Sequence, residues 1–84
     1  MDTQEIINDV VNGLKELSDD NSVPRNVKTK IIDTIRLLEE QGDVSIRVNK
    51  ALSHLDEIAE DANMETYTRT QVWNLLSQLE SIKN

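Results

Sequence analysis

Cysteine and phenylalanine are absent from this chain of 84 residues, which holds only two glycines and one proline. Without cysteine the fold has no disulfide and none of the cysteine-ligated zinc sites that stabilise many small domains. The absence of cysteine also fits a reducing compartment, so we expect a cytoplasmic protein. Without phenylalanine, and with aromatic residues at 2%, the core has to be aliphatic.

Basic residues are also in the minority, because nine lysines and arginines stand against sixteen acids and give a net charge of −7. A field of this sign repels nucleic-acid backbones and anionic membranes, which argues against non-specific binding to nucleic acid. No apolar run approaches the roughly 20 residues that a membrane-spanning helix needs. The acidic N-terminal segment has the wrong character for a secretory signal. We therefore expect a soluble protein without a membrane partner.

Apolar residues recur at helical spacing in four stretches of the sequence. The first predicts a helix over residues 3–18, and a polar break follows it. Pro24 belongs in the first turn of the second helix, which ends at Gly42, a residue that tolerates the left-handed conformation found beyond many helix ends. Asp43 is placed to cap the third helix and Asn63 to cap the fourth. No stretch has the alternating pattern of a strand.

The second half of the chain repeats the first at an offset of 41 residues, in caps and turns as well as in apolar positions; Asp43, for example, repeats Asp2. Two unrelated amphipathic hairpins would share only the apolar register, so the matched caps favour a true duplication over coincidence. A period near 41 residues is in the range of HEAT-type helical repeats. We therefore predict one all-α domain over residues 1–84, a four-helix bundle of two helical hairpins (residues 2–41 and 43–84) related by a HEAT-like duplication.

Chain length and repeat number together predict self-association. A chain this short buries only about 60 to 65% of the surface that its unfolded form exposes. Helical repeats bury their apolar faces against neighbours, and three or more are usually needed for an independent core. Two repeats leave an apolar flank open, so we predict a homodimer that covers it.

Positive charge concentrates on one stripe of the second predicted helix, with a matching stripe on the fourth. The candidate partner-binding residues are Arg25, Lys28, Ile32, Arg36, Arg69 and Trp73. The functional interpretation is a docking face for an acidic protein segment, or for a phosphate backbone with Trp73 or Tyr67 stacked on a base. The structural interpretation, which we favour, is a solvated face of paired cations beside a tryptophan that covers the core.

No set of residues points to catalysis or to metal binding. His54, Glu57 and Asp61 fall on one face of the third predicted helix, but they lack the Glu-x-x-His spacing of metal sites in helix bundles. Acidic residues in the turns are explained as helix caps, and nothing places a nucleophile beside a base. We therefore expect no catalytic residue, no metal, no cofactor and no enzymatic activity.

Gly13 stands inside the first predicted helix, where glycine costs about 1 kcal/mol relative to alanine. Close approach of another helix is one explanation, and tolerance on a polar face is the other. The repeat does not decide between them, because the counterpart of Gly13 is the bulky His54.

Three segments of the chain resemble a family of small archaeal proteins of about this length, which are all helical and have no assigned function. The segments are residues 22–27, residues 44–58 with Arg47, and residues 61–80 with Arg69 and Trp73. The resemblance as a whole extends over nearly the whole chain. The resemblance implies an all-α cytosolic protein, and it carries over no catalytic residue.

The leading functional hypothesis is a non-enzymatic module that self-associates and binds another protein through the face bearing Arg25, Lys28, Arg69 and Trp73. The alternative is an accessory factor that binds nucleic acid or a ribonucleoprotein through the same basic stripe, against the net charge of the chain. The two differ in salt dependence, because phosphate contacts weaken steeply with ionic strength and an apolar anchor does not.

Overall fold

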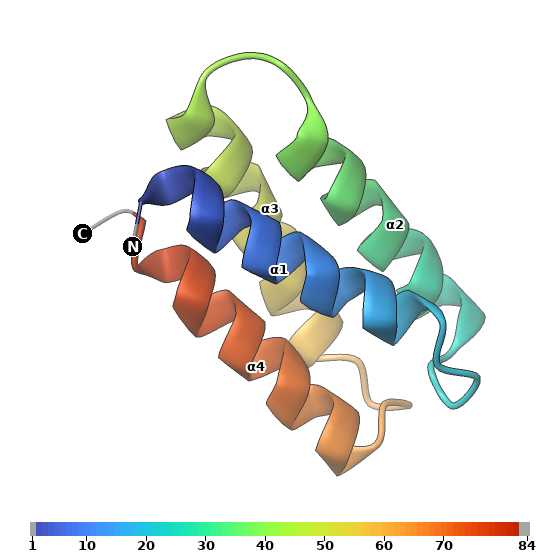
Figure 1. The fold of residues 1–84 in the computed structure, drawn as a ribbon. Helices are drawn as coiled ribbons and strands as arrows, with labels where there is room; N and C mark the ends of the chain where they lie inside the picture. Colours follow the sequence, from blue (N-terminus) through green and yellow to red (C-terminus); the bar gives the residue numbers. More distant parts are fainter. Residues whose placement is uncertain (1, 83–84) are drawn as a thin grey trace.

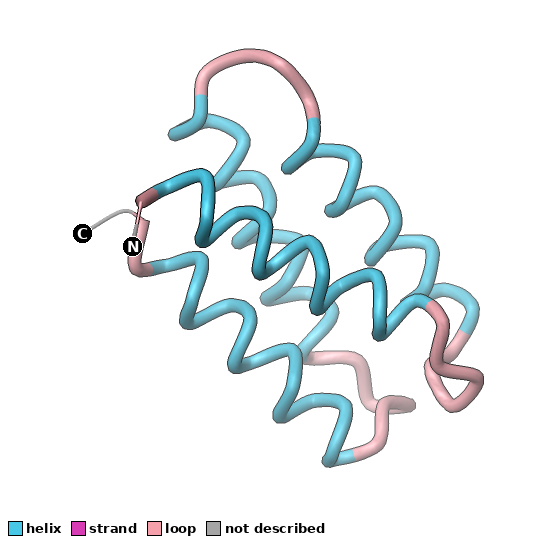
Figure 2. The backbone as a smooth tube through the Cα atoms, in the orientation of Figure 1, coloured by secondary structure: helices cyan, strands magenta, loops and turns pink. Residues whose placement is uncertain are grey.

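The computed structural model describes residues 2–82, so the predicted domain ends at residues 1 and 84 lie outside it. The described residues form four α-helices joined by short turns and contain no strand (Figure 2), which confirms the predicted all-α class. The helices are α1 (Thr3–Ser18), α2 (Arg25–Glu39), α3 (Val44–Ala59) and α4 (Thr66–Glu80). None of these helices is long and apolar enough to cross a membrane.

Consecutive helices run antiparallel and follow one another around a bundle (Figure 1). Helix α1 packs against α2 and α4, and α3 packs against the same two helices. The pairs α1/α3 and α2/α4 are therefore diagonal across the bundle. The hairpins α1–α2 and α3–α4 meet at two interfaces, α2–α3 and α1–α4.

The core is aliphatic, as predicted, and lies between the two hairpins. Its most deeply buried large side chains include Leu14 on α1, Ile31 on α2, Leu55 on α3 and Leu79 on α4. Each hairpin thus buries its apolar face against the other within a single chain. The homodimer was predicted to cover an open apolar flank, and this closure removes that reason for a second copy.

The helix boundaries repeat at the 41-residue offset. Helices α1 and α3 each have 16 residues, α2 and α4 each have 15, and each start in the second hairpin is the counterpart of a start in the first. The turns repeat as well, because Asp20 and Asp61 each accept a backbone N–H two residues further on, at 2.8 and 2.9 Å. Residues 41 positions apart are called equivalent below. Whether the repeat is a HEAT-like duplication stays a prediction.

The ends of the helices differ from the predictions in three places. Asn63 does not cap α4, because it lies in the turn from Asp61 to Met64, before the N-cap residue Glu65, whose side chain makes no capping bond. Pro24 is the N-cap of α2 and not part of its first turn. Gly42 has φ +127°, in the left-handed region expected of it, but it does not end α2, which already stops at Glu39 and is followed by the extended C-cap residue Glu40.

Aspartate caps begin the first helix of each hairpin. Asp2 accepts the N–H of Glu5 at 2.8 Å, and Asp43 accepts that of Ile46 at 3.2 Å. Replacing either aspartate by alanine is expected to lower the free energy of unfolding by about 1 kcal/mol, measured by urea denaturation. The control is Glu65→Ala, which removes no capping bond; a loss as large as that of the aspartate variants would contradict the assignment.

Candidate functional site

The six predicted binding residues are divided between two diagonal helices. Arg25, Lys28, Ile32 and Arg36 lie on α2, and Arg69 and Trp73 lie on α4. Among the described residues no Cα atom of α2 lies within 8 Å of one of α4, so the two helices are not neighbours in the bundle. The structure therefore does not join the two stripes into the one docking face that the hypothesis needs.

Arg69 holds the end of α3 in place. Its guanidinium donates from Nε to the carbonyl of Ala59 at 3.0 Å and from Nη2 to the carbonyl of Asp61 at 2.8 Å. A cation at this position satisfies carbonyls that a helix C-terminus leaves without partners. Arg69 is half-buried, and its hydrogen bonds support the fold.

Arg47 has a similar role that sequence reasoning missed. Its Nη1 donates to the carbonyl of Leu38 at 2.9 Å, at the end of α2, while its Nε is buried without a hydrogen-bond partner among the described protein atoms. The available signal was an arginine one turn into the helix after Asp43, where it reaches back over the turn to the preceding helix.

Trp73 remains exposed at 46% of its surface, and its equivalent, Ile32, at 43%. Trp73 lies one helical turn after Arg69, so it sits on the side of α4 that faces α3. We call this surface the Trp73 flank. Nearly half of the only tryptophan is thus left in solvent, where the sequence favoured a largely buried ring.

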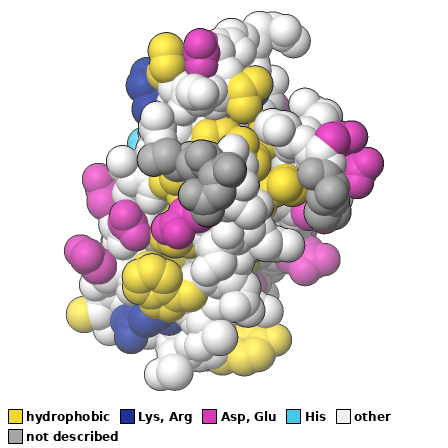
Figure 3. Space-filling model, turned by 90° about the vertical axis from the view of Figure 1, so that its left-hand side faces the viewer, with side chains coloured by type: hydrophobic (Ala, Val, Ile, Leu, Met, Phe, Trp, Pro, Cys, Tyr) yellow, Lys and Arg dark blue, Asp and Glu magenta, His cyan; other side chains and the backbone are white. Residues whose placement is uncertain are grey.

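Several basic residues already have partners inside the molecule. Lys15 lies 3.6 Å from Glu39 and Lys30 lies 3.1 Å from Glu57, in exposed ion pairs worth about 0 to 1 kcal/mol each. With the two capping arginines, four of the nine cations have acceptors within the fold. On the face drawn in Figure 3, lysine and arginine side chains are few and far apart among more numerous acids.

His54, Glu57 and Asp61 do not converge on a metal site. Each meets a different residue of α2 instead, and no group of three or more His, Cys, Asp or Glu side chains is placed to hold a metal among residues 2–82. The partners are Thr34 for His54, Lys30 for Glu57 and Asn26 for Asp61.

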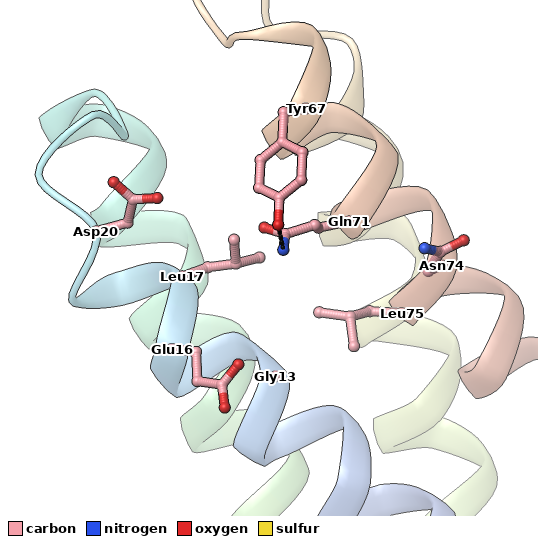
Figure 4. A pocket seen from close by; sticks show the side chains of 8 residues that line it. All are labelled: Gly13, Glu16, Leu17, Asp20, Tyr67, Gln71, Asn74 and Leu75. Carbon is pink, nitrogen blue, oxygen red and sulfur yellow. Dashed lines mark hydrogen bonds between the residues drawn. The ribbon is translucent and has the colours of Figure 1, made fainter.

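A groove of about 370 Å³ opens between α1 and α4 (Figure 4). Its lining consists of Gly13, Glu16, Leu17, Asp20, Tyr67, Gln71, Asn74 and Leu75. At its inner end the helices approach closely, because a Cβ on Gly13 would lie 2.6 Å from Leu75 Cδ2. Close approach of another helix therefore explains the glycine inside α1.

The walls of the groove differ in charge. Glu16 and Asp20 line the α1 side, and the α4 side is neutral and polar, with Gln71 donating to the hydroxyl of Tyr67 at 3.1 Å. Hydrogen bonds from the backbone N–H and hydroxyl of Ser22 hold the pKa of Asp20 below its ordinary 3.8, so this carboxylate is charged at neutral pH. The groove is thus an anionic cleft with a partly apolar floor, suited to binding a cation.

A sequence profile of the uncharacterised protein family UPF0147 matches residues 1–82. The chain belongs to the UPF0147 family. A UPF0147 protein of Sulfurisphaera tokodaii is 39% identical over 72 residues, which cover 84% of this chain and 81% of the relative. One of Methanosarcina mazei is 34% identical over 82 residues, which cover 96% and 88%. The resemblance to a small archaeal family is therefore confirmed.

Two crystal structures have the same fold as this UPF0147 chain. The protein of unknown function MMP1188 matches with a TM-score of 0.89 and 34% identity, over 99% of this chain and 96% of that one. A UPF0147 protein from Thermoplasma acidophilum matches with a TM-score of 0.89 and 35% identity, over 94% of each chain. The UPF0147 fold is thus shown, and function has to be argued from the surfaces.

Proposed function

We propose that the chain is a non-enzymatic protein-binding module that docks a basic protein partner on the Trp73 flank. The observation that carries this proposal is the exposure of Trp73, at 46% of its surface. Tryptophan is a residue type enriched among those that dominate interface energies, because its ring buries a large area when a partner covers it. The groove between α1 and α4 is a second concave surface that a partner could occupy.

Charge favours a basic partner over nucleic acid. The chain carries −7, and four of its nine cations already have acceptors inside the fold. The field of such a molecule speeds encounters with a positively charged protein and opposes encounters with a phosphate backbone. Trp73 is therefore the proposed apolar anchor, and the net negative charge of the chain favours a basic partner.

Self-association through the α3–α4 hairpin is the second candidate. Among residues 2–82, three of the four large apolar side chains that are exposed belong to the α3–α4 hairpin, namely Ile46, Tyr67 and Trp73. Two copies of −7 repel each other, so salt should strengthen a dimer and weaken a complex with a basic partner. Light scattering at low and high salt separates the two.

Site-specific crosslinking tests the proposal. A photoreactive amino acid at position 73 is expected to capture one basic protein in native cell extract, and the same probe at position 32 is not. Ile32 is the matched control because it is equivalent to Trp73 and equally exposed. The captured protein is then purified, and Trp73→Ala is expected to weaken its binding at least tenfold, measured by calorimetry, while Ile32→Ala changes it less than twofold.

Trp73→Ala should leave the fold intact, with a loss of unfolding free energy below about 1.5 kcal/mol, because the side chain is only about half buried. A purified partner that binds Trp73→Ala as tightly as the parent chain would overturn the proposal. Capture of a second copy of the chain itself would overturn the basic partner and establish the dimer.

A further inference from the structure

The two interfaces between the hairpins are equivalent under the 41-residue offset, because α2–α3 in one corresponds to α4–α1 in the other. Polar contacts close the α2–α3 interface. They join Asn26 Nδ2 to Asp61 Oδ2 at 3.0 Å, Lys30 Nζ to Glu57 Oε2 at 3.1 Å, and Thr34 Oγ1 to His54 Nδ1 at 3.4 Å.

The α1–α4 interface lacks these three polar contacts. Its equivalent pairs are Tyr67 with Asp20, Gln71 with Glu16, and Leu75 with Gly13. No hydrogen bond or ion pair joins the described residues of α1 to those of α4. Gln71 instead donates a hydrogen bond to Tyr67 on its own helix, and Asp20 accepts one from Ser22 within the α1–α2 turn. The groove in Figure 4 opens where side chains close the other interface.

Glu16 has the position of Glu57, but the residue of the groove lining that is equivalent to Lys30 is Gln71, a neutral amide, so Glu16 lacks the ammonium that pairs with Glu57. The groove therefore presents a carboxylate whose equivalent in the same molecule binds a lysine. Leu17 and Leu75 point into the space between the helices and give it an apolar floor (Figure 4). An alkyl chain that ends in an ammonium matches both surfaces, since lysine buries its stem along apolar atoms and keeps its charge at a polar rim.

We propose that this groove binds a lysine side chain of a partner protein. The alkyl stem lies on Leu17 and Leu75, and the ammonium takes beside Glu16 the place that Lys30 has beside Glu57. The site lies between α1 and α4, on the opposite side of α4 from the Trp73 flank, and does not depend on the function proposed for that flank.

Nuclear magnetic resonance of the full chain tests the site. The probes are a short alanine peptide with one central lysine, blocked at both ends, and the same peptide with its lysine Nε-acetylated. The lysine peptide is expected to cause saturable shifts at millimolar concentration, concentrated on residues 13–20 and 67–75, and the acetylated peptide to bind at least tenfold more weakly. Equal shifts with both peptides, or shifts spread over the acidic surface, would overturn the proposal.

Two variants make the test specific. Gln71→Lys places on α4 the equivalent of Lys30, whose ammonium should pair with Glu16 and fill the groove, so peptide binding is expected to fall at least tenfold. Glu16→Gln removes the carboxylate and is expected to weaken binding about fivefold. Glu57→Gln, the matched control in the closed interface, should change binding less than twofold. If both groove variants fold and bind the lysine peptide as well as the parent chain does, the proposed site is wrong.

Discussion

Replacing Arg69 by alanine is expected to lower the free energy of unfolding by about 2 to 3 kcal/mol. The substitution removes two charge-assisted hydrogen bonds at the end of α3, from the carbonyl of Ala59 and from that of Asp61, which keeps only the N–H of Met64 at 3.3 Å. For a domain of this size the loss corresponds to a fall in Tm of roughly 10 to 20 °C, measurable by circular dichroism.

The matched control is Lys28→Ala at the equivalent position of α2. Lys28 makes no comparable cap in the described structure, so its loss should cost less than about 0.5 kcal/mol. Arg69→Lys should fall between the two, because an ammonium keeps the charge but not the two-pronged donor geometry. Equal stability of the Arg69→Ala and Lys28→Ala variants would contradict this structural role and favour the docking role predicted from the sequence.

The local parts of the fold could be predicted from the sequence, because short-range interactions determine them. The cap at Asp43 depends on an N–H three residues away, and the positive φ of Gly42 depends on the conformation of that one residue. The stripe containing Arg69 was also read correctly as one face of a helix. What that face meets depends on how the hairpins close, and helical periodicity carries no information about closure.

The candidate sites could not be predicted from the sequence, because they too depend on how the two hairpins pack. The predicted docking face combined α2 with α4, which packing places on a diagonal. The groove depends on pairs such as Glu16 and Gln71, which are distant in sequence and become neighbours only through the α1–α4 interface. The repeat contained a usable signal, because the equivalent of Lys30 is the neutral Gln71, so one of the two equivalent interfaces lacks the cation. This difference can be interpreted only when the helices that form each interface are known.

Gly13→His is expected to destabilise the protein by about 2 to 3 kcal/mol. A Cβ alone would lie 2.6 Å from Leu75 Cδ2, and an imidazole adds a ring that the α1–α4 contact has no room for. Gly13→Ala is the control, because the clashing atom is the end of a flexible side chain and the gain in helix propensity, about 1 kcal/mol, offsets its displacement. Urea denaturation measures both variants.

The equivalent interface already shows the compensating change, since His54 stands where α1 has Gly13 and faces the small Thr34 where α4 has Leu75. Combining Gly13→His with Leu75→Thr should therefore recover at least about 1 kcal/mol relative to the sum of the single variants, as a coupling energy in a double-mutant cycle. Strict additivity would mean that the two interfaces do not accept each other's side chains. It would also argue against the proposed lysine-binding groove, because that proposal assumes that Glu16 can pair with a lysine as Glu57 pairs with Lys30 in the equivalent interface.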